Sequence, residues 1–275
     1  MIVDYHMHLR RPGVDCEEVD HTPAAILPFL ETAAARGVDE IGFTEHVYYF
    51  RQTAEIWINE YERERCVYDL DAYCDAVLDA KRQGLPVKLG LEVDYVGERQ
   101  ERLTELIAGY PWDFLLGSVH YIGDVAIDQE PGIWGLHSIE ESWRRYAQAF
   151  GELAESGRVD VLAHPDLPKI FGRRPDPPAV LAELHEQMAD AAAAADLALE
   201  ISTAGLHKPV GELYPDMELL RACVDRGVPI TTASDAHLPA NVGRDFDQAL
   251  ALAREAGCET VSVFEARQRR QEPLG

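Results

Sequence analysis

The sequence predicts an α/β fold in which parallel strands form a single barrel. Three observations lead to this prediction. Seven short apolar runs recur along the 275 residues, stretches with helical periodicity separate them, and residues able to bind a metal follow the runs. Regular alternation of strand, loop and helix is typical of parallel sheets covered by helices. The length suits one domain with a large buried core, so we expect a single domain over residues 1–275.

Each predicted strand is a short run rich in β-branched and other apolar residues. In chain order, the runs and the polar residues after them are 2–4 before His6 and His8, 41–44 before Glu45 and His46, 87–91 before Glu92 and Asp94, 114–119 before His120, 159–163 before His164, 197–202 before Thr203 and His207, and 229–234 before Asp235 and His237. The carboxyl ends of parallel barrel strands meet on one face, where such barrels place their chemistry. We therefore expect these side chains to converge on one metal site.

The predicted helices lie between the runs. They are expected near residues 22–36, 71–83, 97–109, 138–157, 178–195, 212–227 and 245–257. The first begins at Thr22 and Pro23, a capping residue followed by a proline suited to the first turn. Several end at a glycine, such as Gly157 and Gly227, because glycine accepts the left-handed conformation that terminates a helix.

Two insertions are longer than the usual loops of such folds. Residues 47–70 are rich in aromatic and charged side chains, and residues 121–137 contain glycines, a proline and a tryptophan. Both follow runs that end in candidate ligands, so they are expected either to cover the site as lids or substrate walls or to pack as ordinary surface.

The composition excludes several classes of protein. Acidic residues number 49 and basic residues 25, and the resulting net charge of −24 disfavours binding to nucleic acid, which depends on basic side chains. No apolar run approaches the roughly 20 residues needed to span a bilayer. The first residues lack the basic-then-apolar order of a signal peptide, so we expect a cytoplasmic protein. Five widely spaced cysteines without a C-x-x-C pair indicate reduced thiols.

The metal ligands are first indicated by spacing. His6-x-His8 places two imidazoles on the same side of an extended chain, and Asp235-x-His237 repeats this format at the last run. Glu92 follows a nearly all-apolar run, where a carboxylate is costly to bury unless it is paired or binds a metal. We expect Glu92 to bridge two ions.

His120 and His164 each follow a run singly. Either one alone would more often be a hydrogen-bonded core histidine, but the recurrence over seven runs favours metal binding. The candidates are imidazoles and carboxylates without a thiolate, a set that suits zinc, manganese or iron more than a structural zinc site.

Six motifs in this order resemble those of the PHP (polymerase and histidinol phosphatase) superfamily: DYHMH, FTEH, GLEVDY, GSVHY, AHPDL and SDAH. The longer segments GSVHYIG, DLPKIFG, STAGLHKPVGELYP and SDAHLPANVG resemble its monofunctional histidinol-phosphatase branch, and the resemblance covers nearly the whole chain. It implies a distorted (β/α)7 barrel that holds two to three divalent metal ions at the carboxyl ends of its strands.

The resemblance also implies how the ligands are shared. One ion would take His6, His8, Glu92 and Asp235; a second would take Glu92, His120 and His164; and a third would take His46 and His237. The family usually supplies the third ion with a further ligand, often a histidine, several residues after the H-x-H pair. This chain has no histidine at that spacing, so Asp15 is our expected ligand, with Glu17 and His21 as alternatives.

The expected reaction is hydrolysis of a phosphate monoester. Adjacent divalent ions lower the pKa of a bridging water and stabilise the attacking and leaving oxygens, so a hydroxide held by the metals would attack phosphorus. Glu92 would serve as the catalytic bridging ligand. Asp166, two residues after His164, is expected either to protonate the leaving group or hold a water, or to act as a helix cap or as a partner of a ligand.

Four basic side chains are candidates for binding the substrate phosphate. Lys169, Arg173, His207 and Lys208 follow the fifth and sixth runs, although solvent exposure is the commoner state of any one such side chain. The histidinol-phosphatase branch tends to have an arginine where this chain has His207. Imidazole lacks the bidentate, permanently charged fork of arginine.

Three functions follow from these observations. The first is a histidinol-phosphate phosphatase of histidine biosynthesis, with a small phosphorylated substrate and no nucleic-acid or membrane partner. The second is a PHP phosphoesterase acting on another small ester, such as a nucleotide or sugar phosphate, which His207 favours. The third is a metal-binding PHP domain without catalytic turnover. The sequence predicts no oligomeric state.

Overall fold

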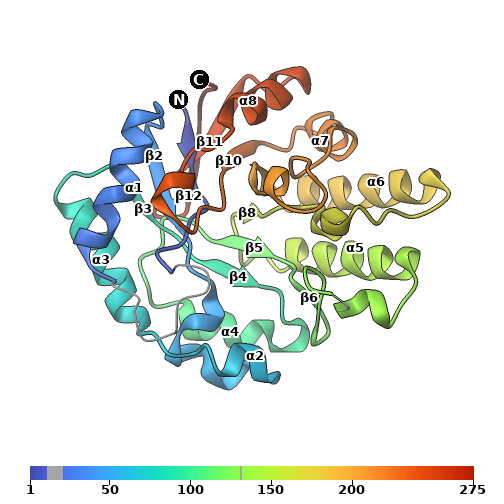
Figure 1. Ribbon diagram of the computed structural model, residues 1–275, viewed down its shortest axis with the longest axis horizontal. Coiled ribbons are helices and arrows are strands. Elements are labelled where there is room, and N and C mark those ends of the chain that lie inside the picture. Colours follow the sequence, from blue (N-terminus) through green and yellow to red (C-terminus); the bar gives the residue numbers. More distant parts are fainter. Residues whose placement is uncertain (11–20, 131) are drawn as a thin grey trace.

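The computed structural model describes residues 1–10, 21–130 and 132–275. Strands occupy the middle of the molecule and helices surround them (Figure 1). One sheet has the strand order β1–β2–β3 and the other the order β10–β9–β8–β5–β4, and all of these strands are parallel to their neighbours. The strand bounds are β1 (Val3–Asp4), β2 (Glu40–Phe43), β3 (Val87–Leu89), β4 (Glu92–Asp94), β5 (Leu116–Ser118), β8 (Val161–Leu162), β9 (Ala198–Ser202) and β10 (Ile230–Ala233). The prediction of an α/β fold with parallel strands is confirmed.

The two sheets meet along both edges through isolated contacts. A parallel bridge joins Met7 to Ala236 beyond the ends of β1 and β10, and another joins His46 to Glu92. Across the described residues the strands do not form one closed sheet. The third predicted run is divided into two strands, β3 and β4, which pair with different neighbours. β3 pairs with β2, whereas β4 pairs with β5, and Gly90 lies at the change.

The ring of Phe114 explains why the chain has glycine at two positions in the interior. A Cβ atom at Gly42 would lie 2.7 Å from the Phe114 ring, and one at Gly90 would lie 2.8 Å from it. Both distances are shorter than packed carbon atoms accept, so only glycine leaves room for the ring. The strands are thereby held close around a filled core.

The seven predicted helices are confirmed and cover the outside of the strands (Figure 1). They are α1 (Pro23–Ala35), α3 (Leu70–Arg82), α4 (Gln100–Ile107), α5 (Ile139–Glu155), α6 (Pro178–Ala194), α7 (Met217–Val224) and α8 (Phe246–Glu255). Side chains cap several amino ends: Ser138 accepts a hydrogen bond from the Glu141 amide, and Asp216 accepts one from Leu219. Thr22 stands before α1 without a side-chain cap bond.

Both insertions contain short elements of their own. The first contains α2 (Glu60–Arg63) and several 3₁₀ turns, and the second contains the antiparallel pair β6 (Tyr121–Ile122) and β7 (Val125–Ala126). The sequence patterns did not predict these elements, because each spans only a few residues.

A hairpin near the end of the chain was also not predicted. β11 (Thr260–Glu265) and β12 (Gln268–Pro273) pair antiparallel with each other. Phe264 of β11 stacks on Phe114, with ring centroids 5.7 Å apart, and lies 6.1 Å from the ring of Tyr5. Tyr5, Phe114 and Phe264 belong to one buried cluster with Val3 and Val161, so the hairpin covers an apolar part of the strands.

The two ends of the chain meet beside this hairpin. The amino group of Met1 donates a hydrogen bond to the carbonyl of Pro273, and the amide of Gly275 donates one to the carbonyl of Met1 at 3.1 Å. The amino end of β1 therefore lies next to the last residues of the chain.

Within the described part of the chain, none of the helices combines the length and the apolar character needed to cross a membrane.

Candidate metal centre

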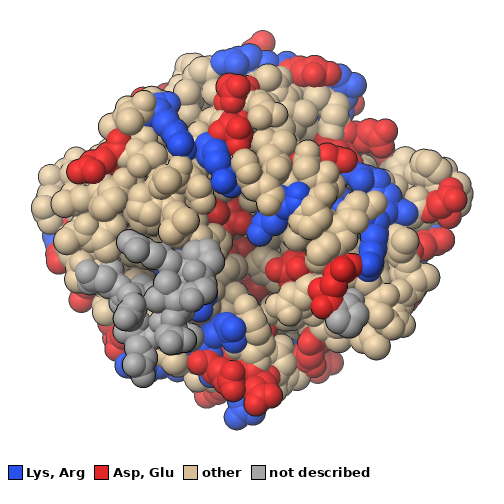
Figure 2. All heavy atoms as spheres, in the orientation of Figure 1, with Lys and Arg blue, Asp and Glu red and all other residues tan. Residues whose placement is uncertain are grey.

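Side chains at or after the ends of all seven predicted runs line a cavity of about 560 Å³. Figure 2 shows a hollow in the middle of this face, with acidic side chains in it and basic side chains near its rim. The predicted metal ligands that line the cavity are His46, Glu92, His120, His164, Asp235 and His237. His6 and His8 are buried beside them, in contact with Glu92 and Asp235. The structure thus brings eight of the predicted ligands together.

Glu92 lies at the centre of this group. Its Oε2 atom is 2.7 Å from Nδ1 of His46 and 3.3 Å from Nε2 of His6. Its Oε1 atom is 3.2 Å from Nε2 of His164 and 3.4 Å from Nε2 of His120. One carboxylate therefore faces four imidazoles, as a bridging ligand requires.

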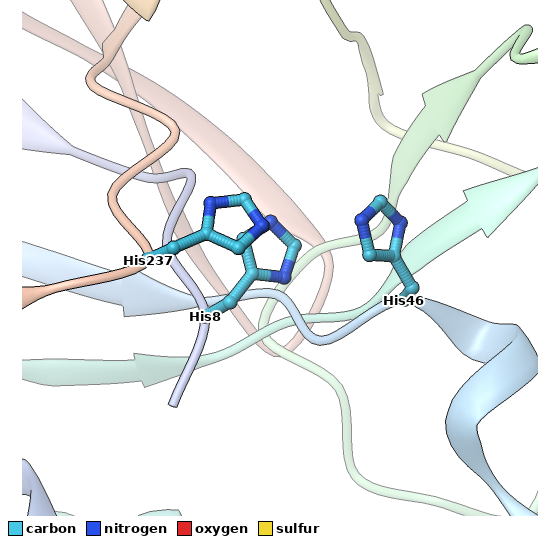
Figure 3. A group of neighbouring side chains, drawn as sticks. All are labelled: His8, His46 and His237. Carbon is cyan, nitrogen blue, oxygen red and sulfur yellow. The ribbon is translucent and has the colours of Figure 1, made fainter. Parts of the chain in front are cut away.

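Four sets of three residues could each hold a metal ion, since their ligand atoms lie within 4.8 Å of one another. These sets are His8, His46 and His237; His6, His8 and Asp235; His6, Glu92 and His164; and His46, Glu92 and His120. His8 thus belongs to two sets. In Figure 3 the rings of His8 and His237 overlap, and His46 stands across from them. The stacked rings of His8 and His237 have centroids 4.3 Å apart.

The hydrogen bonding of these residues fits bound cations. Nε2 of His6, Nε2 of His8 and Oε2 of Glu92 are buried, and no described residue offers them a hydrogen bond of acceptable geometry. Leaving such atoms without a partner costs about 1–3 kcal/mol each. Imidazole nitrogens and carboxylate oxygens are ligands for zinc, manganese and iron, so ions of this kind would satisfy these atoms.

The protonation states favour metal binding at several of the ligands. Burial lowers the pKa of His46 to about 3 and that of His237 to about 4, so both imidazoles are neutral near pH 7. Burial acts to raise the pKa of Glu92, but the histidines around it outweigh this effect and hold that pKa well below its usual range. Glu92 is therefore an ionised carboxylate.

Carboxylates also stand behind several histidines, on the side away from the cavity. Oδ1 of Asp94 lies 2.7 Å from Nδ1 of His120, and Oε2 of Glu200 lies 2.9 Å from Nδ1 of His6. Such contacts fix the orientation of an imidazole and keep its other nitrogen available for a metal. Glu200 was not among the predicted site residues because it lies within β9, whereas the sequence analysis considered residues after the runs.

Two of the candidate ligands adopt a backbone conformation that is uncommon outside glycine. The φ angles of His164 and Asp235 are +26° and +51°. Such residues cost of order 1–3 kcal/mol and persist where their surroundings hold them. Next to Asp235, Ser234 donates hydrogen bonds from its amide and its hydroxyl to Asp4, at 2.8 Å and 2.6 Å. Asp4 thereby fixes the ligand-bearing turn after β10 to β1.

Asp166 and Lys169 form a buried ion pair. The side chain of each is fully buried, and Nζ of Lys169 lies 2.7 Å from Oδ2 of Asp166. Lys169 also donates to the carbonyl of Leu213 at 2.6 Å, and Asp166 accepts a hydrogen bond from the Asp216 amide at 2.8 Å. Burial raises the pKa of Asp166. The structure does not place either side chain among the residues that line the cavity.

The other three predicted phosphate-binding residues lie in different surroundings. Lys208 is exposed and lines the cavity. Nε2 of His207 lies 2.6 Å from Oδ2 of Asp245, and Arg173 pairs with Glu130. Neither His207 nor Arg173 is among the residues that line the cavity.

Both insertions contribute to the cavity wall, so of the two alternatives the structure favours substrate walls over ordinary surface packing. The first supplies Tyr48, Tyr49, Tyr61 and Arg65, and the second supplies Tyr121, Asp128 and Gln129.

Two polar cavity residues outside the insertions, Arg10 and Tyr214, were not predicted. Arg10 donates a hydrogen bond to the hydroxyl of Tyr49 at 2.7 Å, and Tyr214 places a buried hydroxyl that bonds to no described residue. Arg10 directly follows the H-x-H pair, which is the signal that could have indicated it.

The expected third-site ligand, Asp15, lies outside the described residues, as does Glu17. The alternative, His21, has its Nε2 atom 3.8 Å from Oε1 of Glu45. Its ring packs against Tyr68 and Tyr73.

Comparisons with known proteins identify the family of the chain. Residues 18–204 match the family model described as the PHP domain. A curated protein of Deinococcus radiodurans named "Probable histidinol-phosphatase" is 32% identical over 281 residues, which cover 99% of each chain. A Lactococcus lactis protein named "Histidinol-phosphatase" is 25% identical, over 95% of this chain and 94% of its own.

A solved structure has the same fold. It is the histidinol phosphate phosphatase of Lactococcus lactis in complex with zinc, L-histidinol and phosphate. It superposes with a TM-score of 0.75 at 24% identity, and the match covers 98% of both chains. The family-model match over more than half of the sequence, together with a relative that is 32% identical along nearly its full length, shows that this chain belongs to the PHP domain family.

Proposed function

We propose that this chain is a metal-dependent phosphate monoester hydrolase that acts on histidinol phosphate, as a cytoplasmic enzyme of histidine biosynthesis. The observation that carries the proposal is the position of Glu92, whose two oxygens face four imidazoles at the base of an open cavity. The histidinol-phosphatase names of the Deinococcus and Lactococcus relatives support the choice of substrate.

We further propose two to three divalent ions of zinc, manganese or iron. His6, His8, Glu92 and Asp235 would hold one, and Glu92, His120 and His164 a second. His46 and His237 would hold a third, and His8 lies close enough to contribute to it. When bound, the ions would supply an activated water and neutralise charge on the phosphoryl oxygens. The two sheets that carry these residues would together form the distorted (β/α)7 barrel of the family.

The cavity also suits the two charged ends of the substrate. Arg10, Arg65 and Lys208 line it and can attract the phosphate group. Asp128 lines the same cavity, where its carboxylate can pair with the protonated amine of histidinol phosphate. A nucleotide or sugar phosphate offers no such amine, so the combination favours histidinol phosphate.

The leaving alkoxide needs a proton, and two residues are candidates to supply it. Asp166 is the choice from the sequence, and its burial, which raises its pKa, favours the protonated form. Tyr214 lines the cavity, and its hydroxyl has no hydrogen-bond partner among the described residues. Because Asp166 is engaged by Lys169 and the Asp216 amide, we propose that it supports the turn that carries Tyr214 and that the tyrosine hydroxyl is the nearer donor.

The proposal is tested by steady-state kinetics on a panel of phosphate monoesters with added manganese or zinc. We expect kcat/KM for histidinol phosphate to exceed that for nucleoside and sugar monophosphates by at least about tenfold, which is roughly 1.4 kcal/mol of differential transition-state binding. Equal or faster turnover of a nucleotide or sugar phosphate would reject the substrate. Absence of bound metal together with absence of turnover of every ester would reject the enzyme class.

A further inference from the structure

Glu200 is a carboxylate in the middle of strand β9, where Ala198, Leu199 and Ile201 beside it are all apolar. It lies in β9 between Leu199 and Ile201, and its exposed fraction is 0%. An ionised carboxylate is costly to bury unless hydrogen bonds or opposite charges compensate it. Its position therefore requires partners on both of its oxygens.

Both oxygens of Glu200 contact metal-ligand candidates. Oε2 lies 2.9 Å from Nδ1 of His6, and Oε1 accepts a hydrogen bond from the backbone amide of His164 at 3.0 Å. His6 follows β1 and His164 follows β8, so the carboxylate joins two ligand-bearing segments that are far apart in the sequence. The same two residues form one candidate metal set with Glu92.

These contacts act on the two ligands in different ways. An acceptor at Nδ1 of His6 keeps the proton on that nitrogen and leaves Nε2 free to bind a metal. His164 has a φ angle of +26°, which is unfavourable for a residue with a side chain. The hydrogen bond from its amide to Glu200 helps to hold it in this conformation. One carboxylate thus sets the ring orientation of one ligand and the backbone position of another.

We propose that Glu200 is a positioning residue of the metal centre that fixes His6 and His164 together through its two oxygens. Asp94, by comparison, contacts only the His120 ring in this way, at 2.7 Å. The inference rests on the metal centre of the proposed function but not on the identity of the substrate. Its test can therefore be carried out without any phosphate ester.

The substitution Glu200→Gln isolates this role because the side chain keeps its size. A carboxylate accepts hydrogen bonds on both oxygens, whereas an amide accepts on one side and donates on the other. In either orientation of the amide, one N–H group would face the Nδ1 proton of His6 or the amide proton of His164. We expect the affinity for zinc or manganese at the ion held by His6 to fall by about 10- to 100-fold, as measured by competition with a chelator.

A matched control is available near the amino end of β5. Asp113 is also a buried carboxylate that accepts two backbone hydrogen bonds, from Leu89 at 2.9 Å and Ala266 at 3.2 Å. Asp113→Asn makes the same chemical change without contacting a predicted ligand. We expect it to lower the thermal stability of the protein and to leave the metal affinity within about twofold of wild type.

The outcomes separate this inference from the proposed function. Wild-type protein that binds no ion would reject the metal centre, whereas wild-type protein that binds ions with the same affinity as Glu200→Gln would reject the role of Glu200. If Glu200→Gln does not fold, ¹⁵N spectra of histidine-labelled, zinc-loaded wild-type protein decide the matter. We expect a proton on Nδ1 of His6, and an unprotonated Nδ1 would overturn the inference.

Discussion

Oε2 of Glu92 lies 2.7 Å from Nδ1 of His46, although Glu92 begins β4 and His46 follows β2. The parallel bridge between the same two residues is also one of the contacts that join the two sheets. The place where the sheets meet is thus part of the proposed metal centre, so a change at Glu92 would affect candidate ligands from both sheets.

We predict that Glu92→Ala is the most damaging single substitution at the site. It removes the carboxylate that faces His6, His46, His120 and His164, so at least one bound ion per chain should be lost and kcat should fall by about 100-fold or more. Elemental analysis and steady-state kinetics measure both effects. Glu40→Ala, at the opposite end of the neighbouring strand β2, should keep its ions. Full metal content in Glu92→Ala would contradict the prediction.

Metal binding should release protons near neutral pH. Burial opposes protonation of His8 and His120, but their contacts with carboxylates outweigh it and raise the pKa values to about 9 and about 10. Both rings are therefore protonated at pH 7.5 in the metal-free protein and must lose a proton to bind an ion. We expect the affinity for manganese to rise with pH up to about 9. Calorimetric titration in two buffers of different ionisation enthalpy measures the released protons, and identical enthalpies in both would contradict this.

The same pKa values predict how the metal-free protein responds to alkali. A histidine whose pKa is raised on folding adds stability that is fully present below its ordinary pKa of 6.5 and is lost as the pH rises through the raised value. The Tm of the metal-free protein should therefore fall between about pH 8 and pH 10, and bound metal should reduce this fall. Thermal unfolding across this range provides the check. A metal-free Tm that is constant to pH 10 would show that His8 and His120 do not carry these protons.

Adjacent residues His207 and Lys208 should differ in their effect on substrate binding. Lys208→Ala should raise KM for histidinol phosphate by about tenfold with little change in kcat, because Lys208 lines the cavity. His207→Arg should leave KM within about twofold, since His207 pairs with Asp245 away from the cavity. Steady-state kinetics of the two variants provides the comparison. A larger change in KM for the His207 variant would mean that the imidazole turns toward the phosphate.

Tyr214→Phe tests the unpartnered hydroxyl in the cavity. Burial raises the pKa of Tyr214, so the hydroxyl remains a hydrogen-bond donor at any pH at which the enzyme works. We expect kcat to fall by about tenfold while the number of bound ions stays the same. Unchanged kcat would remove Tyr214 from the reaction and return Asp166 as the candidate acid.

The sequence predicted the candidate metal ligands at the ends of strands, because the carboxyl ends of parallel strands converge on one face of the fold. His120 and His164 are examples, since each follows an apolar run and lines the cavity. The sequence could not show that Lys169 is buried, because its partners Asp166 and Leu213 are brought to it by tertiary packing. Lysine in a loop is ordinarily exposed.

Two other differences have equally specific reasons. Glu200 contacts its partners from within a strand, and a pattern based on strand ends passes over it. The change of neighbour between β3 and β4 occurs at Gly90, where Phe114 leaves no room for a Cβ atom, and this approach joins distant parts of the chain.

The meeting of Met1 with the last residues of the chain has a practical consequence for handling the protein. Because Val3 begins β1 and the cavity lies beyond the other end of that strand, anything fused to either terminus would start on the side away from the cavity mouth. The protein could be immobilised on a resin or a sensor surface through either terminus with its cavity still open to solution. A short linker between the termini would also yield a circular permutant whose new ends could be placed in an exposed surface turn.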